Sequence, residues 1–116
     1  MKYLTKILDE ESFNIFVDIE TKDRESPERA LFLSVILQAL LDATQEVKNP
    51  HGHIYRDRAR AWFFCSVGVT CDNFETVCDY AGMDIGYTRT FAYKVINSNE
   101  LKYVRQKIKT ILEKKE

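Results

Sequence analysis

Apolar residues recur at helical spacing along most of the chain. They fall three or four residues apart, as on one helix face, in residues 54–66, 74–81, 84–97 and 100–114. Residues 28–46 are also predicted to be helical, although they are apolar on nearly every side. The pattern predicts an all-α fold, a compact bundle of about five helices forming a single domain over residues 1–116.

Local signals mark several helix ends. Ser26 followed by Pro27 is typical of an N-cap and the first helical position, and Asp72 or Asn73 is expected to cap the helix over 74–81. Gly82 is expected to end that helix in a left-handed conformation. Asp84 then caps the next helix. Residues 1–25 fit a short helix or a strand, and we predict a helix.

The segment 28–46 suggests a subunit interface. A helix that is apolar on all sides has to be enclosed, and the few other helices of so small a protein can hardly cover it. We therefore expect a homodimer, formed through this helix or through the C-terminal one.

Residues 74–96 predict a short helix, a tight turn through Gly82 and a longer helix. This is the layout of a helix-turn-helix, whose second helix enters the DNA major groove. The trihelical core would span about 54–97. Thr88 departs from the pattern, because such motifs usually place a buried aliphatic residue there. An ordinary helical hairpin with a glycine C-cap is the alternative.

If the motif is a helix-turn-helix, the second helix supplies the DNA contacts. Arg89 would read bases, since arginine pairs with guanine edges. Arg56 and Arg60 would contact phosphates. The remaining candidates on the second helix would assist: Tyr87, Thr88, Thr90, Tyr93 and Lys94.

The overall charge limits how such a protein could bind. Seventeen basic and 18 acidic residues give a formal charge of −1. This balance counts against a protein that coats nucleic acid by charge alone, but it does not exclude one whose basic residues are gathered on one face. Because no stretch is long and apolar enough for a membrane span and the start lacks an apolar signal core, we expect no membrane contact and a cytoplasmic location.

No pattern of catalytic or metal-binding residues stands out. Cys65, Cys71 and Cys78 lack the spacing of zinc ligands and are expected to be reduced thiols. His51 and His53 are the only histidines and share one loop. Nucleophile–base pairs and phosphate-binding glycine loops are not evident. We predict no enzymatic activity, no cofactor and no metal.

Three segments, 30–43, 59–63 and 73–84, resemble small helix-turn-helix-like regulatory proteins of phages, prophages and gene transfer agents. The last is the most specific, with an aromatic residue, Val77-Cys78, and then Ala81-Gly82-Met83-Asp84. The resemblance covers roughly residues 28–96. It implies a helical domain tied to phage-type gene regulation or DNA handling.

The leading hypothesis is thus a sequence-specific DNA-binding transcriptional regulator that acts through a helix-turn-helix. The alternative is a protein-interaction module that modulates RNA polymerase or another regulator without touching DNA. It is favoured by the near-neutral charge and by the all-round apolar helix.

Overall fold

The computed structural model describes residues 27–113, in which every regular element is a helix. This confirms the all-α prediction for that part of the chain. Ser26 and the segment 1–25 lie outside the described residues. The five helices are α3 (Pro27–Ala43), α4 (Gly52–Phe64), α5 (Val69–Ala81), α6 (Ile85–Ile96) and α7 (Leu101–Glu113).

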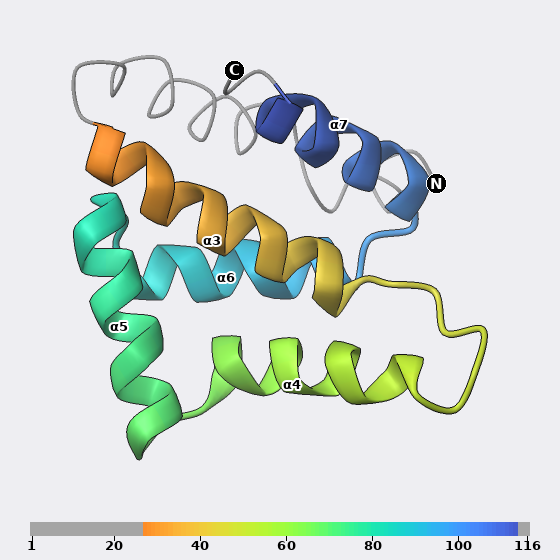
Figure 1. Cartoon of the computed structure of the whole chain (residues 1–116), viewed down its shortest axis with the longest axis horizontal. Coiled ribbons are helices and arrows are strands. Elements are labelled where there is room, and N and C mark those ends of the chain that lie inside the picture. The colour runs from red at the N-terminus through yellow and green to blue at the C-terminus, as the bar shows by residue number, and fades with distance from the viewer. Residues whose placement is uncertain (1–26, 114–116) are drawn as a thin grey trace.

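Helix α3 lies at the centre and packs against the other four helices (Figure 1). Leu33, Ile36 and Leu40 are fully buried in the core, and full burial of such a side chain stabilises a fold by about 1.5–3 kcal/mol. Enclosure is incomplete, however, because Leu31 is 61% exposed and Val35 40% exposed. The all-round apolar helix is therefore covered along most, but not all, of its surface.

An aromatic cluster joins α4 to α5. Phe63 and Phe74 are fully buried, and Trp62 packs edge-on against Phe74 with ring centroids 5.0 Å apart. The indole Nε1–H of Trp62 donates to Asn73 Oδ1 over 2.7 Å, which satisfies the polar end of the ring. Tyr55, near the start of α4, lies outside this cluster and is 61% exposed.

Helix α5 begins five residues earlier than the caps in the sequence suggested. It starts at Val69, directly after Gly68, whose φ of 96° is open to glycine but strained for other residues. Asp72 lies in the first turn of α5, and the side chain of Asn73 accepts a hydrogen bond from Trp62. Neither residue is the cap, because a glycine conformation rather than a side chain sets this helix start.

The connection between α5 and α6 agrees with the prediction. Gly82 is the C-cap with φ 74°, and the Met83 N–H donates to the Cys78 carbonyl over 2.9 Å. The Asp84 carboxylate then accepts from the Tyr87 N–H, which caps α6. The left-handed Gly82 and the Asp84 cap together fix the direction in which α6 leaves the turn.

Candidate nucleic-acid interface

Arg89, the residue expected to read bases, is bound to the body of the protein. Its Nε donates to the Phe63 carbonyl over 2.9 Å and its Nη2 to the Cys65 carbonyl over 2.8 Å. The guanidinium also lies over the Phe74 ring, 5.0 Å from the centroid. The side chain therefore closes the C-terminal end of α4 and holds it against α5 and α6. It does not project into solvent as a base reader would.

Thr88 is also withdrawn from the surface. It is 1% exposed, and its hydroxyl donates to the Asp84 carbonyl over 2.8 Å. This bond explains how a polar residue fills a position where a helix-turn-helix usually has an aliphatic one. Thr88 is a core residue and is not available for DNA contact.

The other α6 candidates share an outer face that carries little charge. Thr90 and Tyr93 are exposed, the latter by 63%, whereas Tyr87 and Lys94 are half-buried. Tyr87 stacks on the buried Phe91. Lys94 is thus the one cation that α6 still presents, and only in part.

The corner formed by α5 and α6 is acidic. A surface hollow there is lined by the carboxylates of Asp72, Glu75 and Asp79, together with Thr76, Tyr80 and Ile85. In a helix-turn-helix the first helix lies across the DNA backbone. Carboxylates at this place would repel phosphates, so the charge at the corner opposes DNA binding in that orientation.

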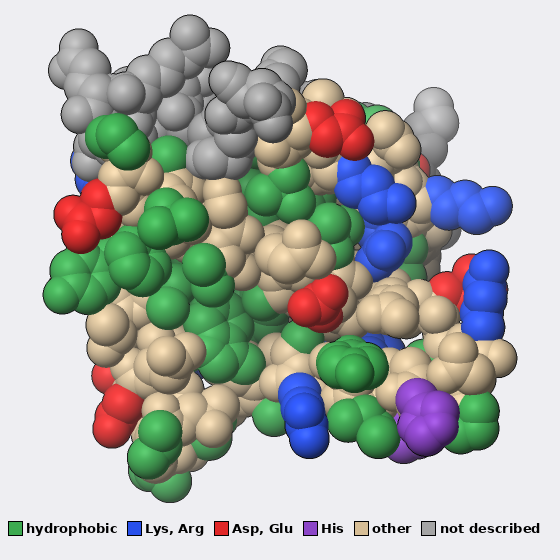
Figure 2. All heavy atoms as spheres, viewed as in Figure 1, with side chains coloured by type: hydrophobic (Ala, Val, Ile, Leu, Met, Phe, Trp, Pro, Cys, Tyr) green, Lys and Arg blue, Asp and Glu red, His purple; other side chains and the backbone are tan. Residues whose placement is uncertain are grey.

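A second and larger hollow is basic. Figure 2 shows Lys and Arg side chains gathered at the end of the molecule where α4 and α7 begin, away from the α5–α6 corner. The hollow has a volume of about 750 Å³ and is lined by five cationic side chains and one carboxylate. We call it the basic groove; its charged residues are Arg56, Arg60, Lys102, Arg105, Lys109 and Glu46.

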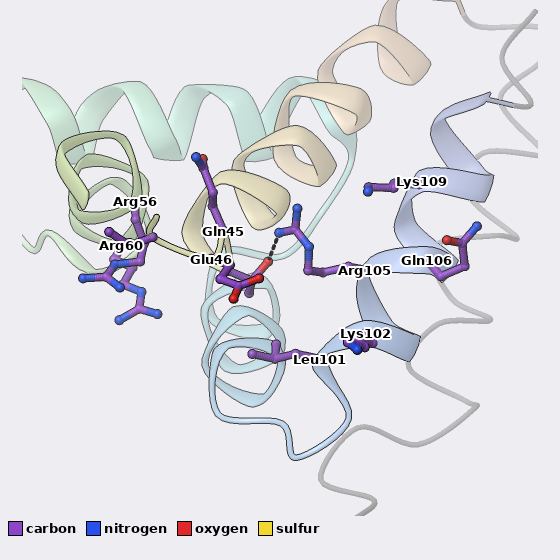
Figure 3. A pocket seen from close by; sticks show the side chains of 11 residues that line it. Gln45, Glu46, Arg56, Arg60, Leu101, Lys102, Arg105, Gln106 and Lys109 are labelled. Carbon is purple, nitrogen blue, oxygen red and sulfur yellow. Dashed lines mark hydrogen bonds between the residues drawn. The ribbon is translucent and has the colours of Figure 1, made fainter. Parts of the chain in front are cut away.

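The spacing of these residues explains why they converge. Arg56 and Arg60 are four residues apart on α4, and Lys102, Arg105 and Lys109 are three and four apart on α7. Each set therefore shares one side of its helix. Figure 3 shows the two sets on opposite sides of the segment after α3, with Gln45 and Glu46 between them.

The C-terminal end of α3 holds two of the arginines. Arg60 Nε donates to the Ala43 carbonyl over 2.9 Å. Arg105 Nη1 donates to the Leu41 carbonyl over 2.6 Å. It also donates to Thr44 Oγ1 over 2.8 Å, the bond drawn as a dashed line in Figure 3. Cations at this end are stabilised by the helix dipole and satisfy carbonyls that lack partners within the helix. The same bonds hold both guanidinium groups at the rim of the groove.

Carboxylates neutralise little of this charge. Among the described residues, one ion pair involves a groove cation, between Arg56 Nε and Asp57 Oδ1 at 3.4 Å. Both partners are neighbours on α4, and Asp57 is well exposed. Such a surface pair is worth little in water, so the groove keeps most of its positive character.

The sequence identified only part of this site. Arg56 and Arg60 were predicted as phosphate contacts, and the structure places both in the groove. Lys102, Arg105 and Lys109 fall at helical spacing within the last predicted helix, residues 100–114. Nothing in the sequence joined these residues to α4, because the connection runs through the end of α3.

The thiols and histidines form no comparable site. No group of three or more His, Cys, Asp or Glu side chains within residues 27–113 could hold a metal ion. Cys78 is fully buried, and burial raises the pKa of its thiol above the ordinary value. His51 and His53 are exposed on the loop and first turn of α4.

The chain matches no protein-family model, no curated protein and no solved structure. Within the described part, none of the helices has both the length and the apolar character needed to cross a membrane.

Proposed function

We propose that the protein binds double-stranded DNA through the phosphate backbone, with the basic groove as its contact surface, and that it acts in transcription regulation. The observation behind this proposal is charge segregation. A chain with a formal charge of −1 gathers five cations and one carboxylate in a single hollow. Phosphate neutralisation by Lys and Arg supplies most of the affinity of such proteins.

The proposal moves the DNA contact away from the outer face of α6. A helix-turn-helix reads bases with the N-terminal residues of its second helix, and here Arg89 is tied to α4 while the neighbouring corner carries carboxylates. The groove lies at the opposite end of α6, where Leu101 of the following helix lines it. Helices α5 and α6 then serve mainly as the scaffold that supports α3 and α4.

Fluorescence anisotropy with a labelled duplex of about 20 base pairs tests the proposal. Binding should weaken steeply as salt rises, with a slope of log K against log[salt] of roughly −0.9 per phosphate contact. The variant Lys102→Gln/Lys109→Gln should lower both the affinity and the magnitude of the slope. Absence of binding at 50 mM salt would overturn the proposal.

A second candidate function is protein contact through an apolar surface on α3 and α5. Leu31 and Val35 are exposed next to Phe32, which stacks on the half-exposed Tyr80 with ring centroids 5.0 Å apart. Figure 2 shows hydrophobic side chains gathered over this part of the molecule. We propose a homodimer as the first partner to test there, and RNA polymerase or another regulator as the alternative.

The oligomeric state decides this candidate. Light scattering should give twice the chain mass for the wild type and the chain mass for Leu31→Lys/Val35→Lys. A monomeric wild type would exclude the homodimer.

A further inference from the structure

The hydrogen bonds of Arg105 leave one defined side of its guanidinium open. The group carries five N–H donors in a planar fork. Two acceptors, the Leu41 carbonyl and Thr44 Oγ1, occupy Nη1. No described residue accepts a hydrogen bond from Nε or Nη2. Those two nitrogens form the side edge that binds two oxygens of one phosphate at once.

Thr44 fixes this orientation. The residue is 6% exposed, and its hydroxyl donates to the Leu40 carbonyl over 2.8 Å. A hydroxyl has one proton and two lone pairs, so its oxygen is left to accept from Arg105. The end of α3 thereby determines which edge of Arg105 is left without an acceptor among the described residues.

Arg60 is held in the complementary way. Its Nε is the atom that donates to the Ala43 carbonyl. The two Nη nitrogens, which form the other bidentate edge, make no hydrogen bond to any described residue. Figure 3 places Arg60 and Arg105 on opposite sides of Gln45 and Glu46, so the two forks cannot share one phosphate oxygen pair.

We propose that the basic groove holds two separate phosphates of a phosphodiester backbone, one on the Nε–Nη2 edge of Arg105 and one on the Nη1–Nη2 edge of Arg60. Thr44 is the positioning residue for the first fork. The proposal rests on the proposed DNA binding, and it adds that affinity depends on the geometry of two arginines as well as on the number of charges. Lysine has no fork and cannot replace either arginine.

Arginine Nε–H signals in ¹H–¹⁵N NMR spectra of the full chain test which edges are used. Addition of a 20-base-pair duplex should shift the Arg105 Nε–H signal, whereas the Arg60 Nε–H signal should stay near its free position because it remains bonded to Ala43. Inorganic pyrophosphate is the second probe and should produce the same pattern at higher concentration. A duplex that binds while Arg105 Nε–H stays unchanged overturns the proposal.

Two variants that keep every charge provide an independent test by duplex affinity. Thr44→Val should weaken binding about fivefold, the size of one hydrogen bond, without changing the salt slope, and Thr44→Ser should restore it. Arg105→Lys should weaken binding by at least as much with an unchanged slope. If Thr44→Val and Arg105→Lys both bind like the wild type, the fork geometry is wrong.

DNA binding and the geometry of the two arginine forks are tested separately. If no duplex binds at low salt, the proposed DNA function fails, and the pyrophosphate titration alone judges the forks. A shift of Arg105 Nε–H with pyrophosphate then supports a phosphate site, and no shift overturns it.

Discussion

The two ends of α6 differ in charge and in the use of their arginines. At its N-terminal end, Arg89 is hydrogen-bonded to two backbone carbonyls at the C-terminal end of α4, and three carboxylates line the neighbouring hollow. At its C-terminal end, Arg60 and Arg105 also bind backbone carbonyls, but each keeps an open edge in a hollow with three further cations. An arginine can thus brace a helix end and still keep donors that no described residue uses.

The largest effect is expected from removing groove charge. The triple variant Arg56→Gln/Lys102→Gln/Lys109→Gln should lower duplex affinity on the order of 100-fold at 0.1 M salt, since each phosphate contact changes the salt slope by roughly 0.9. Anisotropy over a salt series measures both quantities. A variant that binds within twofold of the wild type would place the contact elsewhere.

Arg89 provides the opposite test. Arg89→Met should lower the free energy of unfolding by about 2–4 kcal/mol, because it leaves two carbonyls without their charged donor. Below the unfolding temperature, its duplex affinity should stay within twofold of the wild type. Urea denaturation and anisotropy measure the two effects. A stable variant with greatly reduced affinity would return DNA reading to α6.

Two glycine-to-alanine substitutions near the α5–α6 turn distinguish the cost of backbone strain from the effect of helix propensity. Gly82→Ala should destabilise by roughly 1–2 kcal/mol, because a φ of +74° is strained for a residue with a Cβ. Gly86→Ala is the matched control, where the nearest atom is Asp84 Oδ2 at 3.4 Å. There alanine should be neutral or stabilising by up to about 1 kcal/mol. Thermal unfolding compares the two, and equal losses would contradict the assigned turn.

Neutralising the acidic corner should have the smallest effect on DNA. Asp72→Asn/Asp79→Asn should raise duplex affinity by less than about twofold at 0.15 M salt, since exposed charges more than about 8 Å apart are largely screened. A larger increase, measured by anisotropy, would show that DNA passes close to α5.

Features that depend only on residues close together in the sequence could be predicted. Gly82 and Asp84 act on atoms within a few positions of themselves, so the turn and the cap of α6 could be predicted. The start of α5 could not, because it depends on the conformation of Gly68, while the expected cap Asn73 binds Trp62.

The hydrogen-bond partners of the arginines could not be predicted from local sequence patterns. Arg89 reaches carbonyls 24 and 26 residues away, and Arg105 reaches acceptors 61 and 64 residues away. A charged residue on a helix is expected to face water, and only the packing of α3, α4, α6 and α7 shows which arginines are bound. Phosphate contact by Arg56 and Arg60 stays a prediction, but the structure shows that both line one hollow with cations of α7, which the spacing along the chain could not show.

Backbone amide mapping by NMR during titration with a 20-base-pair duplex distinguishes the basic groove from α6 as the DNA contact surface. Shifts should concentrate on the first turns of α4, on residues 44–47 and on α7 from Leu101 to Lys109, while Thr90 and Tyr93 of α6 stay unchanged. Shifts confined to α6 and the α5–α6 turn, with the groove silent, would contradict this prediction.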